Sequence, residues 1–403
     1  MTPGVPPSAV VRPVLLTVNT GSSSLKVSVF GIDHGSPLVA AAEFTALGTA
    51  EAAVRWDHEG EQEASAHPDA DQGAAFDEVL GEVDRLGWVP EAIGHRIVHG
   101  GADHVAPELA TPALLEQLEA LVPLAPLHQP HNLWPVRRIA ERRPDVAQVL
   151  SYDTAFHATI PDVARHFALP RSYLAKGVLR YGFHGLSYEH VVSVLPSLMG
   201  PASDGRAIVA HLGAGSSLCA IHHGRSVATT MGFSPIDGVP MATRSGALDP
   251  GALIYLLRQG LSVDELDELL NRRSGLLGYS GISGDMRTLL GSKAPDAQGA
   301  VDLYCYRIRE AIGALIADLG GLDALVFTGG IGENSPEIRS RVCDGLEWLG
   351  VLLDDQSNNA GSERIDAHDA NVVVGVVHAD EAAVLARHTR QVVSGSLDRP
   401  TTD

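Results

Sequence analysis

The hydrophobic and polar positions of the chain follow two patterns, one typical of strands and one typical of helices. An apolar run at 14–18 is followed by Asn-Thr-Gly-Ser-Ser-Ser and then by alternating apolar and polar residues to Phe30. This order predicts a strand, a tight turn and a second strand. The same pattern returns at 206–222, around Gly-Ala-Gly-Ser-Ser. The repetition indicates an internal duplication, with two related domains.

Further strands and helices are predicted between and after these two hairpins. Helices are predicted at 111–121, 262–271 and 302–319, and strands at 147–150, 324–327 and 371–377. The strand at 324–327 opens into TGGIGENSPEIR, and α/β proteins bind nucleotides where a strand leads through a glycine turn into a helix. The Pro-rich segment APLHQPHN is predicted to be a loop. Strands that alternate with helices predict the α/β class.

The length and the charge of the chain restrict what it can be. A chain of 403 residues is too long for one simple core and is expected to form two domains. Its 49 acidic and 29 basic residues give a net charge of −20, which repels nucleic acid and anionic membranes. We therefore expect no nucleic-acid partner, and an anionic substrate has to be attracted by locally placed Arg and Lys.

The cysteines and the start of the chain bear on the compartment. Cys219, Cys305 and Cys343 are widely spaced and odd in number, which favours buried free thiols in a reducing cytoplasm over a disulfide framework. The opening MTPGVPPSAVVRP is a Pro-rich tail without the apolar core of a signal peptide. No stretch approaches the roughly 18 apolar residues of a membrane span. We expect a cytoplasmic protein that does not bind membranes.

The turn after the first strand has the composition of an anion-binding loop. Asn19, Gly21 and several hydroxyls precede Lys26, and no acidic residue lies between positions 14 and 30. Small side chains let backbone N–H groups approach an anion, while hydroxyls and Lys supply hydrogen bonds and charge. From these residues alone, a phosphate site and an ordinary hairpin turn are equally open. The absence of Walker A, HRD, DFG and complete GxGxxG motifs argues against P-loop, protein-kinase and simple Rossmann proteins.

A series of motifs resembles the acetate kinase family, whose superfamily includes sugar kinases, Hsp70 and actin. The resemblance runs from Leu16 to Thr389, and its motifs stand in the family's order. They are VNTGSSSLK, HRIVHGG, APLHQPHN, YDTAFH, YGFHGLS, AHLGAGSSL, MGFSPIDGVPMATRSGALDPG, SGISGDMR and TGGIGEN.

This resemblance implies a fold, a reaction and an assembly. The fold is α/β, with two actin-like (ribonuclease H-like) domains and a nucleotide cleft between them. The reaction is reversible transfer of the ATP γ-phosphoryl group to acetate, giving acetyl phosphate and ADP. The resemblance also implies a homodimer. The expected domains are a flexible tail at 1–13, an N-terminal domain at 14–155 completed by a C-terminal helix at 381–403, and a nucleotide-binding domain at 156–380.

Four residues match catalytic positions of the family. Arg96 is expected to hold the acetate carboxylate and Arg244 to stabilise the transferring group, roles for which a planar guanidinium is suited. His184 matches a histidine that stabilises the transition state. The resemblance makes Asp153 catalytic, either as the residue that orients an arginine or as a proton acceptor. Orientation is favoured, because acetate is already ionised near neutral pH and needs no base.

The remaining site residues are also carried over from the family. The residues expected to line the substrate pocket are Val98, Leu127, His128, Phe183 and Pro235. ATP contacts are expected from Lys26, His211, Leu212, Gly213, Ala214, Gly215, Asp285, Met286, Arg287, Gly330, Ile331, Gly332, Glu333 and Asn334. A metal site formed by His128 and His131 is disfavoured, because they lie in a Pro-broken segment without a third ligand.

Magnesium, or manganese in its place, is implied as the ion that bridges the ATP phosphates. Asn19 and Glu381 match the family's metal positions, and Asp380 is an alternative to Glu381. The turn HLGAG departs from the family's HLGNG, so Ala214 replaces a polar side chain and one phosphate or metal-water contact is lost.

Two other functions remain open at this stage. One is the same chemistry on propionate, because a single methylene gives only about 1–3 kcal/mol of discrimination. The other is a nucleotide-binding regulator without catalysis, which actin-like folds also allow. The presence of Arg96, Asp153, His184, Arg244 and Glu381 argues against the regulator.

Overall fold

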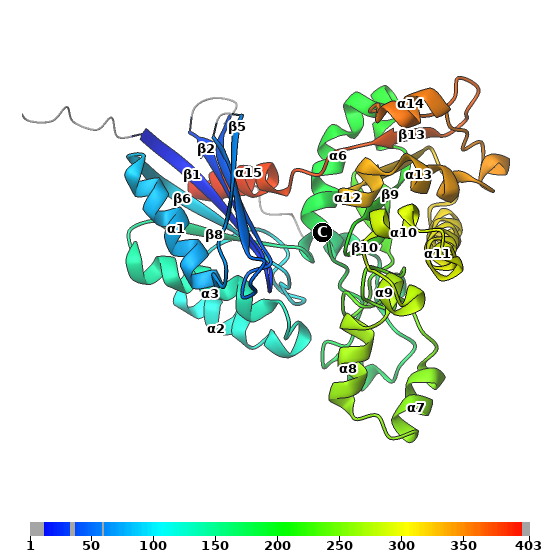
Figure 1. The fold of residues 1–403 in the computed structure, drawn as a ribbon, viewed down its shortest axis with the longest axis horizontal. Coiled ribbons are helices and arrows are strands. Elements are labelled where there is room, and N and C mark those ends of the chain that lie inside the picture. The colour runs from blue at the N-terminus through cyan, green and yellow to red at the C-terminus, as the bar shows by residue number, and fades with distance from the viewer. Residues whose placement is uncertain (1–11, 33–36, 59, 397–403) are drawn as a thin grey trace, which may run out of the picture. The chain divides into compact units, whose positions relative to one another are not determined.

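The chain forms two compact units (Figure 1). The structure, a computed structural model, describes residues 12–32, 37–58 and 60–396. One unit comprises residues 1–155 and 381–403, and the other comprises residues 156–380. Residues 1–11 of the expected tail at 1–13 lie outside the described residues.

The first unit is built on an eight-stranded sheet with the strand order β5-β4-β3-β2-β1-β6-β8-β7. Its strands are β1 (Arg12–Thr20), β2 (Leu25–Gly31), β3 (Leu38–Thr45), β4 (Ala53–His58), β5 (Glu61–Ala66), β6 (Trp88–Ile97), β7 (Glu108–Leu109) and β8 (Ala147–Tyr152). β1, β6 and β8 run parallel, whereas β1, β2 and β3 pair antiparallel. The predicted first hairpin is confirmed, with Thr20 opposite Leu25.

Helices cover both faces of this sheet. They are α1 (Gln72–Arg85), α2 (Pro112–Glu119), α3 (Gln129–Arg142) and α15 (Glu381–Val393), with the 3₁₀ turn η1 (Val122–Leu124). Leu16 of β1 shares a core with Phe76 of α1, and its neighbour Leu15 shares another with Ala386 of α15. Successive strand residues point to opposite faces, so β1 is buried on both sides. Gly94 of β6 allows α15 to approach, because a Cβ atom there would collide with that helix.

The second unit contains a five-stranded sheet with the order β11-β10-β9-β12-β13. Its strands are β9 (Arg206–Leu212), β10 (Ser216–His222), β11 (Arg225–Thr229), β12 (Ala324–Thr328) and β13 (Val373–Val376). The first three pair antiparallel, and β9, β12 and β13 run parallel. The set β3-β2-β1-β6-β8 has the same order and directions, which confirms the duplication at the level of topology.

The helices of the second unit lie around this sheet. They are α4 (Asp162–Arg165), α5 (Arg171–Leu174), α6 (Gly185–Met199), α7 (Pro250–Arg258), α8 (Val263–Arg272), α9 (Gly275–Ser280), α10 (Met286–Gly291), α11 (Pro295–Leu319), α12 (Gly329–Asn334), α13 (Pro336–Cys343) and α14 (Asp355–Ala360). Short 3₁₀ turns are η2 (Ala155–Thr159), η3 (Gly200–Asp204) and η4 (Glu347–Leu349). α6 packs on one core of the sheet and α11 on the other.

Several sequence predictions hold and several need correction. The Thr111 cap of α2 and the Ser262–Glu265 capping box of α8 are confirmed. APLHQPHN is not entirely a loop, because α3 begins at Gln129. Pro130 fits its first turn, where backbone N–H groups have no intrahelical partner. α11 begins at Pro295 rather than at 302 for the same reason.

The C-terminal helix is shorter than expected. It ends at Val393 rather than at 403, because Gly395 adopts a φ of 68° and the chain turns away from helical geometry. Residues 397–403 lie outside the described residues. No helix in the described ranges has the length and apolar character needed to cross a bilayer. The three cysteines are buried free thiols, as expected.

Candidate active site

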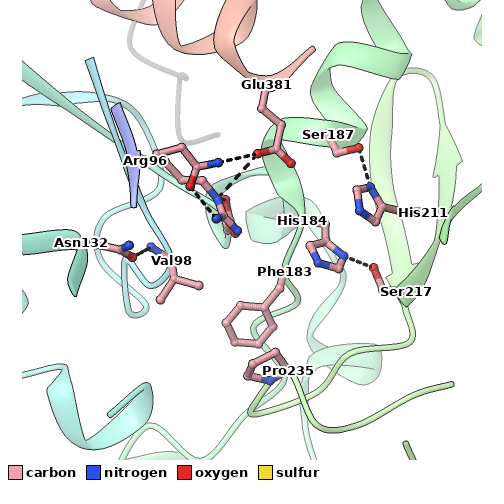
Figure 2. A network of polar contacts seen from close by, with 12 residues as sticks. Arg96, Val98, Asn132, Phe183, His184, Ser187, His211, Ser217, Pro235 and Glu381 are labelled. Carbon is pink, nitrogen blue, oxygen red and sulfur yellow. Dashed lines mark hydrogen bonds and ion pairs between the residues drawn. The ribbon is translucent and has the colours of Figure 1, made fainter. Parts of the chain in front are cut away.

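Three candidate residues lie at the ends of three neighbouring strands in the first unit. Asn19 ends β1 together with Thr20, Arg96 lies near the end of β6, and Asp153 follows β8 directly. Because these strands are parallel, their carboxyl ends reach the same edge of the sheet. Glu381, the first residue of α15, lies beside Arg96 at this edge (Figure 2). The fold therefore brings four predicted site residues of this unit together.

The guanidinium group of Arg96 is held in a fixed orientation. Nε donates to Asp153 Oδ1 at 2.9 Å, Nη2 donates to Asp153 Oδ2 at 2.5 Å, and Nη1 donates to Asn19 Oδ1 at 3.0 Å. Burial lowers the pKa of Arg96, but the charges of Asp153 and Glu381 outweigh burial and raise that pKa overall. Nη1 and Nη2 each carry a second N–H group. Arg96 is thus an oriented cation that can still bind a carboxylate.

Asn19 and Glu381 present the oxygen atoms that Mg²⁺ prefers. Asn19 Nδ2 donates to Glu381 Oε2 at 3.3 Å, so the amide and the carboxylate are adjacent. No cluster of three or more His, Cys, Asp or Glu side chains suited to a metal occurs among the described residues. Mg²⁺ is commonly held by one or two protein oxygens together with waters and phosphates, so this pair fits such an ion. Glu381, one of the two alternatives at this position, lies beside Asn19.

The first glycine turn is braced within its own unit. Gln72 Nε2 donates to the carbonyl of Gly21 and so fixes the start of the turn. Lys26, an expected nucleotide ligand, forms an ion pair with Glu43 at 2.6 Å, and Glu43 also pairs with Arg55. These two cations lower the pKa of Glu43 against the opposing effect of burial. The charge of Lys26 is therefore partly neutralised on the sheet.

The substrate-pocket candidates of this unit lie near the start of α3. Val98 is buried, and its N–H donates to Asn132 Oδ1 at 2.8 Å. Asn132 Nδ2 donates in turn to the carbonyl of Thr20 at 2.6 Å. Leu127 and His128 are half-buried, and His128 is the N-cap residue of α3. Asn132 thus ties the ends of β1 and β6 together.

His184 is the best-supported candidate of the second unit. It is one of few non-glycine residues with positive φ among those described, at 61°, and it immediately precedes α6. Its Nδ1 lies 2.9 Å from Ser217 Oγ, and its ring stacks on His211 with centroids 4.2 Å apart. His211 Nδ1 in turn lies 2.8 Å from Ser187 Oγ (Figure 2). Left-handed backbone at a polar side chain is typical of functional sites.

The neighbouring Phe183 is fixed by a buried histidine. Phe183 is 1% exposed, and its carbonyl lies 2.9 Å from His157 Nε2. His157 Nδ1 lies 2.9 Å from Ser226 Oγ. Burial lowers the pKa of His157 to about 4, so this ring is neutral at pH 7 and donates from Nε2 to the carbonyl.

Arg244 and His184 converge on the space above Gly215. A Cβ atom at Gly215 would lie 3.2 Å from His184 Nε2 and 3.6 Å from Arg244 Nη1. Arg244 Nη1 also donates to the carbonyl of Pro235 at 3.4 Å and lies 3.7 Å from Met241 Sδ. Glycine at 215 thus keeps this space open beside an imidazole and a guanidinium.

The other expected ATP residues of the second unit lie on two turns. Leu212 is buried at the end of β9, whereas Ala214 is exposed in the turn that Gly213 and Gly215 complete. The second turn is itself helical, since α12 contains Gly330, Ile331, Gly332, Glu333 and Asn334. Gly329 brings this helix close to β9, because a Cβ atom there would lie 2.8 Å from the Leu212 carbonyl.

Two acidic residues expected near the nucleotide use their carboxylates inside the protein. Glu333 accepts hydrogen bonds from the N–H groups of Gly329 at 2.8 Å and Ala379 at 3.0 Å. Asp285 caps α10, which begins at Met286, and pairs with the exposed Arg287 at 2.6 Å. Both carboxylates are thus engaged within the protein, while the Arg287 side chain is 91% exposed.

Known proteins resemble this chain over nearly its whole length. The sequence profile of the acetokinase family matches residues 14–387. The chain belongs to the acetokinase family. It is 45% identical over 398 residues to the acetate kinase of Rhodopseudomonas palustris (strain TIE-1), covering 95% of this chain and 99% of that protein. It is 44% identical over 388 residues to the acetate kinase of Rhizobium meliloti, covering 94% and 98%.

Solved structures agree with this placement in the acetokinase family. A propionate kinase from Francisella tularensis subsp. tularensis SCHU S4 has a TM-score of 0.88 and 31% identity, covering 94% of this chain and 100% of that one. The acetate kinase of Porphyromonas gingivalis has a TM-score of 0.84 and 34% identity, with the same coverage. The expected α/β fold with two actin-like domains is confirmed.

Sequence reasoning missed several residues of this acetokinase. Asn132, Ser217 and Tyr188 hold predicted site residues in place, and Glu43 pairs with Lys26. Ser217 had a signal, because it belongs to the Gly/Ser turn that repeats the first one. Asn132 also had one, because it ends the family motif APLHQPHN. Tyr188 and Glu43 had none, since their partners Ser217 and Lys26 are distant in sequence.

Proposed function

We propose that this acetokinase is an acetate kinase, which transfers the γ-phosphoryl group of ATP reversibly to acetate and gives acetyl phosphate and ADP. The observation that carries this proposal is the arginine fixed by a buried carboxylate, Arg96 on Asp153, in a chain 45% identical to acetate kinases. Phosphoryl transfer requires positioning and neutralisation of charge more than it requires a strong base.

The first unit supplies the groups for the acid. Arg96 binds the acetate carboxylate through its remaining N–H groups, and Asp153 orients Arg96. Asp153 is 1% exposed and bonds the guanidinium through both oxygens, which supports orientation over proton transfer. Val98, Leu127 and His128 of this unit are assigned to the apolar end of acetate, and the other two residues expected there, Phe183 and Pro235, belong to the second unit.

The second unit supplies most groups for the phosphates. Arg244 and His184 neutralise the transferring group, and their convergence above Gly215 supports this role. Nucleotide contacts come from the turns at 211–215 and 330–334, from 285–287 and from Lys26. Asn19 and Glu381 would hold a Mg²⁺ or Mn²⁺ ion, which neutralises phosphate charge when bound.

The test is an ATP-dependent acyl-hydroxamate assay on the full chain. We expect hydroxamate from acetate, and a loss of at least about a thousandfold in kcat/KM for both Arg96→Ala and Arg244→Ala. Arg364→Ala is the matched control, because this exposed arginine forms its ion pair with Asp366, a residue that is not assigned to the site. Absence of hydroxamate with any short acid would favour a nucleotide-binding regulator, and full activity of both site variants would remove the assigned roles.

Propionate is the second candidate substrate, and the structural similarity to a propionate kinase favours it. Comparison of kcat/KM for acetate, propionate and butyrate decides between them. We expect kcat/KM for acetate to exceed that for propionate by about 10-fold or more, because one additional methylene group in a fitted pocket changes kcat/KM by about this factor. A higher kcat/KM for propionate reverses the assignment.

A homodimer in the cytoplasm completes the proposal. α7 contains no buried residue although its sequence is apolar, and Ile254 and Tyr255 are 50% and 61% exposed. Exposed apolar patches of this kind are typical of protein interfaces. Buried free thiols support a reducing compartment.

Sedimentation tests the assembly. Wild type is expected to sediment as a dimer and the double variant Ile254→Glu, Tyr255→Glu as a monomer. Val163→Glu, at an exposed apolar residue of α4, is the control that remains dimeric. A monomeric wild type contradicts the proposed assembly.

A further inference from the structure

A buried chain of hydroxyl groups leads from α6 to the imidazole of His184. Ser217 of β10 lies 2.9 Å from His184 Nδ1, and its Oγ is also hydrogen-bonded to the hydroxyl of Tyr188. Ser217 and Tyr188 are both 0% exposed. Tyr188 stands one helical turn after His184, and its N–H donates to the carbonyl of His184 at 3.1 Å. The three groups therefore form one local network within a single unit.

The direction of these hydrogen bonds follows from the proton of Tyr188. In the described part of the chain, Ser217 Oγ is the hydrogen-bond partner of this hydroxyl. If Ser217 donated to Tyr188, the tyrosine proton would be buried without an acceptor, which costs about 1–3 kcal/mol. Tyr188 therefore donates to Ser217, and Ser217 donates to His184 Nδ1. Burial also raises the pKa of Tyr188 well above its ordinary value, so the tyrosine keeps its proton.

A neutral imidazole that accepts at Nδ1 carries its proton on Nε2. Nε2 is the nitrogen beside Gly215, where a Cβ atom would lie 3.2 Å from it and 3.6 Å from Arg244 Nη1. The imidazole proton and the guanidinium thus reach the same space. The ring of His211 stacks on this imidazole with centroids 4.2 Å apart, which hinders the ring flip that would exchange the two nitrogens.

We propose that Tyr188 and Ser217 are positioning residues that hold His184 in the tautomer with the proton on Nε2. The neutral ring then donates a hydrogen bond to the transferring phosphoryl group without first being protonated. This inference rests on the proposed function for its catalytic part, whereas the tautomer is a property of the protein alone.

Nitrogen-15 NMR of histidine-labelled full-length protein reads the tautomer directly. A His184→Gln variant assigns the signal among the 18 histidines. We expect wild type to carry the proton on Nε2. Tyr188→Phe should show both tautomers, because Ser217 then donates or accepts equally well. A proton on Nδ1 in wild type overturns the inference, whatever the activity.

Kinetics on the same proteins test the consequence. We expect kcat to fall about fivefold in Tyr188→Phe and at least tenfold in Ser217→Ala, with both KM values within twofold of wild type. Tyr304→Phe is the matched control, since this buried tyrosine also bonds a serine, Ser216, at 2.9 Å, and its kcat should be unchanged. Thermal unfolding of Tyr304→Phe measures how much stability is lost when such a buried hydroxyl group is removed.

The two readouts separate two kinds of failure. Wild-type kcat in both Tyr188→Phe and Ser217→Ala overturns the positioning role. Absence of acyl phosphate from wild type overturns the proposed function and the catalytic part of this inference. In that case the NMR signal still tests the hydrogen-bond chain.

Discussion

A glycine without strained backbone can still be irreplaceable at this site. Gly215 does not have positive φ, so an alanine fits its backbone. The methyl group of that alanine would however stand 3.2 Å from His184 Nε2 and 3.6 Å from Arg244 Nη1. It would occupy the space that we assign to the transferring phosphoryl group.

Gly215→Ala is therefore expected to lower kcat at least tenfold while the free energy of unfolding changes by less than about 1 kcal/mol. The control is Gly313→Ala on the exposed side of α11, where a Cβ atom meets nothing within 4 Å. It should keep full kcat and stabilise the protein by about 0.5–1 kcal/mol. Hydroxamate kinetics and urea unfolding measure both, and an active Gly215→Ala protein would show that this space is not used.

Ala214 stands where the family's HLGNG turn has asparagine, and we expect this replacement to remove one phosphate or metal-water contact. Its side chain is exposed, so an asparagine fits without rearrangement. We expect Ala214→Asn to lower the KM for ATP about three- to tenfold, the value of one added hydrogen bond. An unchanged or raised KM would show that the turn does not face the nucleotide.

At the scale of elements, the start of α3 connects two strand ends. Asn132 is 3% exposed and bonds both the Val98 N–H and the Thr20 carbonyl, so it sets the spacing of Asn19 on β1 and Arg96 on β6. Local pattern does not reveal this connection, because the bonded residues are 34 and 112 positions apart.

Removal of this amide should act on stability and on binding together. Asn132→Ala leaves two buried backbone groups unpaired and is expected to cost about 2–4 kcal/mol in urea unfolding. The KM for acetate should rise severalfold in the same variant. Asn271→Ala, which removes two exposed hydrogen bonds to Asp267 within α8, should change neither quantity. Lost stability with an unchanged KM would make Asn132 purely structural.

The elements also show what the sequence can and cannot predict. The hairpin at 14–30 was predictable because its alternation and its turn are local. The start of α3 was not, since a proline fits a loop and a first helical turn equally. The pairing of Lys26 with Glu43 depends on strand register, which hydrophobic pattern leaves open. The proximity of Asn19 and Glu381, 362 positions apart, followed only from family resemblance.

For the whole molecule, buried histidines connect stability to pH. Burial lowers the pKa of His95, His99 and His157 to about 4 each. In the unfolded chain these histidines have the ordinary pKa of about 6.5, so they bind protons as the pH falls below that value. In the folded chain they bind protons only when the pH approaches about 4. Stability is therefore complete above pH 6.5 and falls as the pH decreases toward 4.

Each of these histidines is expected to remove roughly 2 kcal/mol of unfolding free energy by pH 5. Urea unfolding at pH 7.5, 6.5, 5.5 and 5 measures the slope. His157→Gln should give a shallower slope, because one of the neutral rings is gone. Equal slopes in the variant and in wild type would contradict the assignment for His157.

The course of the backbone between the two units has a consequence for evolution and engineering. The chain leaves the first unit after Ala155 and returns to it at Glu381, so both joints lie within two residues of the candidate carboxylates Asp153 and Glu381. Glu333 accepts a hydrogen bond from the N–H group of Ala379, just before the second joint. We therefore expect an insertion or graft at either boundary to disturb the proposed reactive centre, so that an exchange of one unit between homologues would also exchange part of the proposed chemistry.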